Sequence, residues 1–382
     1  MHTQNNKSPN ETPTSATTLE INLNAIEANL KFYRSFLNAD TKIVCMVKAD
    51  AYGAGAVHIA QTLQDQSADY LAVATPTEGI ELRHSGITTP IMVMNPEPNN
   101  LPPLFHHHLE PEVYSFRLLN ALSEQAERTK LPTPLPIHIK IDTGMHRLGF
   151  NPSTDLNLLI NKLKRSPRLL LTSVFTHLVG SDDPSLNTFS NAQYTTFLNA
   201  TQHLQSAFPH KILRHICNSA AIQYLPQFHL DMVRLGLGLY GINPRGNMML
   251  HNVSTLKTKI LQIHNVEHTD TVGYNRKGIL THNSRIATLA AGYADGLDRR
   301  IGCGRTYCLV NGQKAPYVGN ICMDVSMIDV TGIDCHEGDT AVIFGSSLPV
   351  TRLSDAAETI PYEILTNIGR RVQRVYLRTP LN

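Results

Sequence analysis

Residues 42–61 read KIVCMVKADAYGAGAVHIAQ and contain the two halves of a β–α unit. The apolar run Ile43–Val47 has the length and the β-branched content of a buried strand. It ends at Lys48, and small residues with two glycines, Gly53 and Gly55, precede a helical pattern. A lysine at this place is either the solvated end of a strand or a reactive amine, and the rest of the chain must distinguish the two.

The same unit recurs between about residues 40 and 240, where short apolar runs alternate with amphipathic stretches such as STDLNLLINKLKRS. The runs are Ile43–Val47, Tyr70–Ala74, Ile91–Met94, Leu109–Tyr114, Ile137–Ile141, Leu170–Phe175, Ile212–Cys217 and Met232–Leu237. Eight β–α units in about 200 residues favour a closed (β/α)8 barrel over an open sheet. The fold class that we predict is α/β, with a TIM-like barrel first.

After about residue 250 the pattern changes to short alternating runs separated by turn signals. Asn311-Gly312 lies between two such runs and predicts a two-residue hairpin, because both residues tolerate positive φ. We therefore predict a barrel over residues 18–248 and a mainly β domain over 249–382. The polar residues 1–17, rich in Pro, Thr and Asn, predict a disordered tail.

The composition excludes several classes of protein. Hydrophobic residues make up 42% of the chain, charged residues 17%, and the net charge is +2, which is typical of a globular protein without a nucleic-acid or membrane partner. The six cysteines are scattered without a CxxC pair, which favours reduced thiols in the cytoplasm. We see neither a signal peptide nor an apolar run of about 18 residues, the length of a membrane helix.

Chemistry-bearing residues stand where the predicted strands end, which is where barrel enzymes place their catalytic groups. They are Lys48, Lys140, Arg147, His177, Asn218, Ser219, Arg234 and Gly236. The set holds an amine, a guanidinium and an imidazole, with Ser after the seventh run and Gly within the eighth, where barrels often bind phosphate. Together these groups suggest pyridoxal phosphate bound as a Schiff base of Lys48.

Taken singly, most of these residues also have a purely structural explanation. Lys48 could be a solvated strand end, His177 a core histidine and Ser219 a helix cap. Arg234 is harder to explain in this way, because a guanidinium in an apolar run needs partners. The triple His106–His108 lacks a carboxylate or cysteine at ligand spacing, so we expect no metal site.

Nine motifs connect the chain to a known family. In order, they are VKADAYGAG, IKIDTGMHRLGF, FTHLVGSDD, CNSAA, DMVRLGLGLYG, TVGYN, AGYADG, VGNICMD and YEILTNIGRRVQRVY. From about residue 18 to its end the chain resembles the alanine racemases, which are (β/α)8-barrel enzymes that use pyridoxal phosphate. The resemblance implies interconversion of L- and D-alanine, which supplies D-alanine for peptidoglycan.

Racemisation requires removal of a proton from one face of the α-carbon and its return to the other. The resemblance implies an external aldimine with Lys48 as one base and Tyr274 of a partner subunit as the other. The ordinary pKa of both side chains is near 10, so we expect neighbouring charges to lower it. Because one base would come from a second chain, we expect a homodimer with shared active sites.

The resemblance also assigns the groups that hold the cofactor. Arg234 would donate to the pyridine nitrogen and, because a guanidinium keeps its proton, would leave that nitrogen unprotonated. His177 would pack beside the ring and bond to Arg234. Tyr52, Ser219 and the backbone at Gly236 and Leu237 would hold the phosphate, and Asn218 would be a further cofactor-binding residue.

Substrate binding is assigned in the same way. Arg147 would bind the substrate carboxylate, and the partner's Met323 would add a backbone N–H. Lys140 matches a lysine that can carry a carbamate, which would brace Arg147. The entry corridor would contain Asp182, Tyr293, Arg299, Asn320 and Arg370.

Two of these corridor positions depart from the family pattern. Asn320 stands where an arginine is common, and Arg370 stands where a tyrosine is common. We hypothesise that Arg370 partly restores the positive charge lost at Asn320. The departures concern the selectivity of the corridor rather than the chemistry.

Three other functions remain open at the level of sequence. A racemase for serine or for a broader set of amino acids would share Arg147. A non-catalytic carrier of pyridoxal phosphate would resemble the barrel alone, without the domain that holds Tyr274 and Met323. A barrel decarboxylase would have a different second domain and an acid in place of Arg234.

Overall fold

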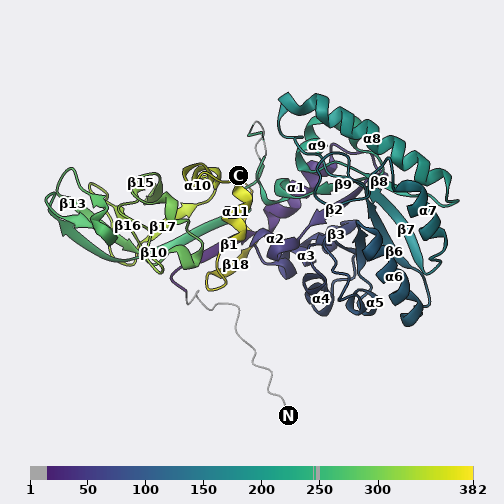
Figure 1. The fold of residues 1–382 in the computed structure, drawn as a ribbon. Coiled ribbons are helices and arrows are strands. Elements are labelled where there is room, and N and C mark those ends of the chain that lie inside the picture. Colours follow the sequence, from purple (N-terminus) through teal and green to yellow (C-terminus); the bar gives the residue numbers. More distant parts are fainter. Residues whose placement is uncertain (1–14, 244, 247–249, 382) are drawn as a thin grey trace, which may run out of the picture. The chain divides into compact units, whose positions relative to one another are not determined.

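The computed structural model describes residues 15–243, 245–246 and 250–381. The chain divides into two compact units, which are described separately (Figure 1). The barrel unit comprises residues 24–251. The β unit comprises the described residues before 24 together with residues 252–380.

The barrel unit contains a closed barrel of eight strands, in which each strand pairs in parallel with the next. The strands are β2 (Lys42–Met46), β3 (Tyr70–Val73), β4 (Ile91–Val93), β5 (Glu110–Val113), β6 (Leu135–Lys140), β7 (Leu169–Phe175), β8 (Leu213–His215) and β9 (Met232–Leu235). Pairing of Lys42 with Met232 closes the ring between β2 and β9. All eight predicted strands and the predicted barrel are thereby confirmed.

Helices follow the strands, and their local sequences explain where they begin. They are α1 (Leu23–Arg34), α2 (Lys48–Tyr52), α3 (Ala56–Asp65), α4 (Pro76–His84), α5 (Pro102–His106), α6 (Phe116–Thr129), α7 (Leu156–Lys164), α8 (Asn187–Ser206) and α9 (Ser219–Tyr224). Thr75 and Glu78 form a capping box at the start of α4. The Ser115 side chain caps α6, which buries Leu118, Leu122 and Ala126 on one face.

The segment α2 is not an ordinary helix. Ala49, Asp50, Ala51 and Tyr52 have φ values of 52°, 52°, 52° and 54°, so this turn directly after Lys48 is left-handed. Such a conformation costs an L-residue roughly 1–2 kcal/mol. The Glu78 carboxylate stabilises the turn by accepting from the backbone N–H of Ala49 at 2.7 Å.

The β unit is built around the long strand β10 (Ser254–Val266). Its main sheet runs in the order β15-β14-β17-β10-β1-β18, and β13 pairs with β10 and β16. The other strands are β1 (Thr18–Asn22), β11 (Thr271–Val272), β12 (Gly278–Ile279), β13 (Ser284–Leu289), β14 (Tyr307–Val310), β15 (Gln313–Pro316), β16 (Ser326–Asp329), β17 (Thr340–Phe344) and β18 (Gln373–Leu377), with two short helices, α10 (Thr351–Ala356) and α11 (Pro361–Thr366). Asn311 and Gly312 turn between β14 and β15 with positive φ, which confirms the predicted hairpin.

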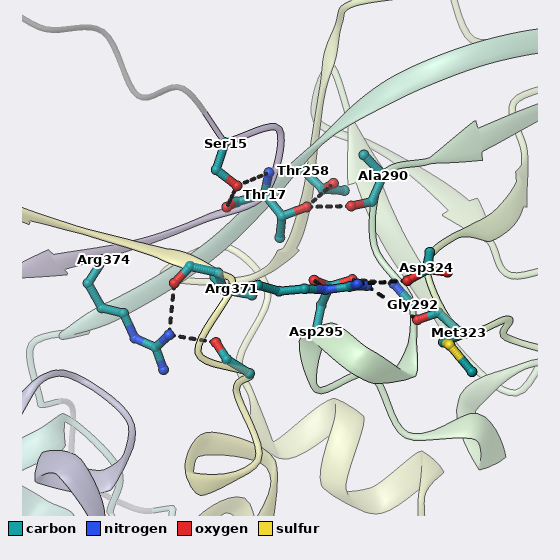
Figure 2. A network of polar contacts seen from close by, with 12 residues as sticks. Ser15, Thr17, Thr258, Ala290, Gly292, Asp295, Met323, Asp324, Arg371 and Arg374 are labelled. Carbon is teal, nitrogen blue, oxygen red and sulfur yellow. Dashed lines mark hydrogen bonds and ion pairs between the residues drawn. The ribbon is translucent and has the colours of Figure 1, made fainter.

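The beginning of the chain requires a correction. We predicted residues 18–22 as part of the barrel, but β1 lies between β10 and β18 in the β unit. Ser15, Thr17 and their neighbours are also ordered parts of this unit rather than tail. Thr17 is buried, and its hydroxyl group donates to the carbonyl of Ala290 at 2.6 Å (Figure 2).

The misplacement has a physical reason. The alternation in TLEIN specifies a strand with one buried face but does not specify which sheet covers that face. The rest of the predicted tail, residues 1–14, lies outside the described residues, and so does most of the predicted boundary near residue 248.

Within the described ranges, the helices are too short or too polar to cross a membrane. All six cysteines lie in the described part of the chain as free thiols, and burial raises the pKa of Cys45 and Cys217 to about 12.

Candidate active site

Lys48 lies immediately beyond strand β2, where the barrel places its carboxyl ends, and it begins the left-handed turn. Its side chain is half-buried. Burial lowers the pKa of the Lys48 amine, and the guanidinium of Arg147 lowers it further. A larger fraction of this amine is therefore neutral near pH 7 than in an ordinary lysine.

Arg234, on β9, is the most extensively bonded side chain of the site. Its Nη2 donates to the carbonyl of Thr176 at 2.7 Å and to Nδ1 of His177 at 3.3 Å. Burial lowers the pKa of Arg234 to about 10, so the group remains a cation at neutral pH. Burial and then the Arg234 charge hold the pKa of His177 well below its ordinary value, which keeps that imidazole neutral and able to accept.

A cradle of backbone and hydroxyl groups lies beyond β8 and β9. The hydroxyl of Ser219 accepts from the N–H of Gly236 at 2.9 Å and from the N–H of Gly238 at 3.2 Å. A Cβ atom on Gly236 would lie 3.0 Å from the Tyr52 hydroxyl oxygen, so only glycine leaves this space open. Leu237 is buried directly after it.

Asn218 caps α9 and fixes the loop beside this cradle. Its side-chain oxygen accepts from the N–H of Ala221 at 3.0 Å and from the hydroxyl of Ser181 at 2.7 Å. The helix cap that the sequence allowed at Ser219 is therefore Asn218 instead. This leaves the Ser219 hydroxyl to the backbone of the cradle.

A buried ion pair lies beside these residues. Lys140 Nζ is 3.1 Å from Oε1 of Glu112, and both side chains are almost fully buried. Burial raises the pKa of Glu112 to about 7 and lowers the pKa of Lys140, while the attraction between them opposes both shifts. Sequence analysis missed Glu112, although a carboxylate in the apolar strand LEPEVY was a visible signal.

Arg147 is exposed, in contrast to these neighbours. It follows a turn in which the Asp142 carboxylate accepts from the N–H groups of Gly144, Met145 and His146 at 3.0–3.1 Å. Its charge acts on both Lys48 and His177. The barrel unit therefore brings together Lys48, Lys140, Arg147, His177 and Arg234.

The remaining predicted residues of the reaction lie in the β unit. Tyr274 begins a short 3-10 turn and is 67% exposed, and Met323 is 55% exposed. Asn320 donates through Nδ2 to the carbonyl of Tyr274 at 3.2 Å. Asn320 thus fixes the backbone of Tyr274.

Figure 2 shows the network that holds Met323. Arg371 donates to both carboxylate oxygens of Asp295 at 2.6 and 2.9 Å, and to Asp324 at 2.7 Å. The Asp295 carboxylate also accepts from the N–H of Gly292 at 2.9 Å, and the Met323 carbonyl accepts from the N–H of Ala294 at 3.0 Å. The network ties together the loops that carry Tyr293, Met323 and Arg370. Sequence analysis missed Arg371 and Asp295.

The corridor residues are divided between the units. Asp182 belongs to the barrel unit, where its carbonyl accepts from Arg245 at 3.2 Å. Tyr293, Arg299 and Arg370 are exposed in the β unit. Among the described residues, which include the triple His106–His108, no group of three or more His, Cys, Asp or Glu side chains is placed so that it could hold a metal ion.

The fold and the site define a class of protein: a (β/α)8-barrel enzyme built around a lysine amine at a strand end. Comparison with known families is specific. The model "Alanine racemase, N-terminal domain" matches residues 21–244, and "Alanine racemase, C-terminal domain" matches residues 253–376. The chain belongs to the alanine racemase family, and it is an isomerase by class.

Individual relatives agree over nearly the whole chain. The alanine racemase of Clostridium tetani is 36% identical over 370 residues, which are 94% of this chain and 95% of the relative. The solved alanine racemase of Clostridium difficile 630 is 34% identical, with a TM-score of 0.90 over 97% of this chain and 99% of that chain. The alanine racemase of Bartonella henselae, solved with covalently bound pyridoxal phosphate, is 28% identical, with a TM-score of 0.86 over 95% of this chain and 100% of that chain.

Proposed function

We propose that this protein interconverts L- and D-alanine with pyridoxal phosphate as its cofactor and with Lys48 and Tyr274 as its two bases. The observation that carries the proposal is the Lys48 amine, which lies at a barrel strand end with its pKa lowered by burial and by Arg147. The relatives support the substrate and the cofactor, since they are alanine racemases and one contains covalently bound pyridoxal phosphate.

The residues of the barrel fit this cofactor. The open space above Gly236, bordered by Tyr52 and Ser219, suits a phosphate, with Asn218 and Leu237 beside it. In the described part of the chain, the hydrogen bonds of Arg234 run through Nη1 and Nη2, which leaves Nε–H to donate to the pyridine nitrogen. His177 would pack against the ring. When bound, pyridoxal phosphate withdraws electrons from the α-carbon of the substrate and so weakens its C–H bond.

Two bases then account for the change of configuration. The neutral Lys48 amine takes or returns the α-proton on one face of the substrate. Tyr274 does the same on the other face, and we assign it to the partner subunit of a homodimer. The high exposure of Tyr274 in its own chain supports this assignment, because a side chain that serves another subunit must reach away from its own core.

Substrate orientation is assigned to groups near these bases. Arg147 would bind the carboxylate through charge-assisted hydrogen bonds, and the partner's Met323 would add a backbone N–H. Lys140, paired with Glu112, would stiffen the surroundings of Arg147, with or without a carbamate. Asp182, Tyr293, Arg299, Asn320 and Arg370 would form the corridor. We further assign the enzyme to the cytoplasm and to D-alanine supply for peptidoglycan.

The test follows hydrogen exchange at the α-carbon. Purified protein with added pyridoxal phosphate is incubated with L-alanine in heavy water, beside the variants Lys48→Ala and Tyr274→Phe. We expect D-alanine that carries α-deuterium from the native protein and a large loss of its formation in both variants. Binding of the cofactor without any deuterium in alanine would refute the proposal, and a panel containing serine would then identify the substrate.

A further inference from the structure

A chain of hydrogen bonds connects Arg234 to a carboxylate through three intervening side chains. Arg234 Nη1 lies 2.9 Å from His215 Nδ1, His215 Nε2 lies 3.0 Å from the Ser173 hydroxyl, and that hydroxyl lies 2.7 Å from His138 Nδ1. His138 Nε2 then lies 2.9 Å from Oε2 of Glu110. The five residues come from five successive strands, β9, β8, β7, β6 and β5.

The direction of this chain follows from the chemistry of its first member. A guanidinium only donates, so His215 must accept at Nδ1 and carry its proton on Nε2. His215 therefore donates to the oxygen of Ser173, and the single hydroxyl proton of Ser173 is free to go to Nδ1 of His138. His138 accepts this hydrogen bond at Nδ1 and donates its own proton from Nε2 to the carboxylate of Glu110.

The alternative is a charged His138 that donates from both nitrogens. Ser173 would then accept from both imidazoles, and its own proton would have no partner among these groups, which is costly at a fully buried site. A charge on His138 would also add a further cation to an interior that already holds Arg234 and Lys140.

The surroundings of His215 favour a neutral ring. His138 and His215 are both fully buried, and burial followed by the Arg234 charge holds the pKa of His215 well below its ordinary value. Tyr70 on β3 is a further ionisable neighbour, and its ring meets that of His138 edge-on at 5.9 Å. The charge of Arg83 also acts on Glu110. Tyr70 also forms a hydrogen bond with Glu110, so the chain ends in a carboxylate that receives two donors.

We propose that Glu110, His138, Ser173 and His215 form a one-way hydrogen-bond relay. The relay fixes the position of Arg234 and holds the proton of His215 on Nε2, the ring nitrogen that faces away from Arg234. These four are positioning residues, because they act through Arg234. The inference rests on the proposed function in one respect: with Arg234 locked in this way, only its Nε–H can reach the cofactor nitrogen, which stays unprotonated.

The test reads the tautomers directly. Holoenzyme labelled with ¹⁵N only at histidine is examined by NMR at pH 7, and His138→Gln and His215→Gln assign the two signals among the 18 histidines. We expect each ring to have one protonated nitrogen, Nε2. A proton on Nδ1 of either ring, or two protons on His138, would overturn the proposal.

Variants then break the relay at its middle and at its end. In Ser173→Ala, we expect the ¹⁵N signals of His138 Nδ1 and His215 Nε2 to shift, because each nitrogen loses its hydrogen-bond partner, while both rings keep their proton on Nε2. In Glu110→Gln, the amide oxygen still accepts, so both tautomers should persist. An unchanged His138 in Ser173→Ala would contradict the relay, and Glu110→Gln provides a second test if Ser173→Ala does not fold.

Kinetics separate positioning from mere stability. Loss of one buried hydrogen bond behind Arg234 should lower kcat of Ser173→Ala about tenfold, with KM within about twofold. Ser190→Ala, which removes another fully buried hydroxyl of the barrel unit, is the control and should leave both values unchanged. Equal kcat in the two variants would refute the relay. If native protein did not racemise alanine, the proposed function would fail, while the tautomers would still test the relay.

Discussion

Single residues set the reactivity of this site through charge. The Lys48 amine is shifted toward its neutral form by burial, by Arg147 and by Lys140, while the carboxylates of Glu78 and Glu112 oppose the shift. The net direction is a lowered pKa. The amine is therefore neutral over a wider range of pH than an ordinary lysine, as a base or a nucleophile requires.

The first prediction concerns this shift. Arg147→Gln removes a cation that lowers the pKa of Lys48, so the pKa rises and the neutral amine appears only at higher pH. The rate at which apoprotein binds pyridoxal phosphate covalently is followed by absorbance as a function of pH. The pH at which this rate increases should be higher in the variant than in the native protein. Arg128→Gln, on an exposed face of α6, is the control and should match the native profile. Identical profiles for all three proteins would argue against the influence of Arg147.

The second prediction concerns Lys140. A carbamate forms when a neutral amine adds to carbon dioxide and releases a proton, and it would place a second anion near the Glu112 carboxylate. Glu112→Gln removes this repulsion and, by removing the anion, also lowers the pKa of Lys140 further. We expect a severalfold stronger carbamate signal by ¹³C NMR with labelled bicarbonate in this variant. Lys140→Met should abolish the signal, and equal signals in native protein and Glu112→Gln would show that Glu112 has no control over it.

At the scale of elements, the unusual feature is the left-handed turn of α2. Its four residues with positive φ are held between Lys48 and the left-handed Gly53 by backbone hydrogen bonds and by the carboxylate of Glu78. The same carboxylate accepts from the N–H of Ala74 at 2.6 Å, so one side chain joins the ends of β2 and β3. The strained turn lies directly beside the Lys48 amine.

The third prediction tests this strain. Ala49 is exposed, so Ala49→Gly removes no packing and relieves an unfavourable φ, and the free energy of unfolding should stay the same or rise by up to about 1 kcal/mol. Ala192→Gly, at an exposed position of the right-handed helix α8, should lower it by about 1 kcal/mol. Both are measured by chemical denaturation, and equal losses would show that the turn is unstrained.

The fourth prediction concerns strand β1, which the chain contributes to the β unit from its beginning. Ile21 is fully buried in the sheet between β10 and β18, so Ile21→Ala should destabilise this unit by roughly 2–5 kcal/mol. Hydrogen exchange should accelerate in β10 and β18 and stay slow in the barrel strands. Ile360→Ala, at a largely exposed residue of the same unit, should change stability by less than about 0.5 kcal/mol. Faster exchange in the barrel instead would contradict the assignment of β1.

At the scale of the whole molecule, the residues of the proposed reaction are divided between two compact units. The barrel unit carries Lys48, Arg147 and Arg234, and the β unit carries Tyr274 and Met323. A loop network around Arg371 and Asp295 holds Met323, and a hydrogen bond from Asn320 holds the backbone of Tyr274. A homodimer that pairs the barrel unit of one chain with the β unit of another would complete two sites.

The fifth prediction follows from this division. Lys48→Ala and Tyr274→Phe should each be inactive alone, but a mixture allowed to exchange subunits should regain activity, because each mixed dimer contains one complete site. With random pairing of equal amounts, the activity should approach about a quarter of the native value. A double variant that carries both changes on one chain, mixed with Lys48→Ala, should regain none. Absence of recovery in the first mixture, with exchange verified, would place both bases within one chain.

The features that the sequence predicted are those that depend on residues close together in the chain. Alternation and apolar runs are local, so all eight barrel strands and the Asn311-Gly312 hairpin were predicted correctly. The barrel then followed from the regular β–α repeat, and the motifs placed the chain in its family. The residues at the strand ends could be named because a barrel collects those ends at one place.

Contacts between residues far apart in the chain were decided by the tertiary structure alone. Strand β1 could have paired with either unit, and its partners β10 and β18 lie more than 200 residues away. Glu112, Glu78 and Arg371 act through partners on other elements, which no local pattern indicates. The relay from Arg234 to Glu110 is the extreme case, because each member comes from a different strand and its proton positions depend on all the others. By itself, the sequence determined which elements form and which family they belong to, while the charge and hydrogen bonding of the site depend on three-dimensional proximity, which only folding creates.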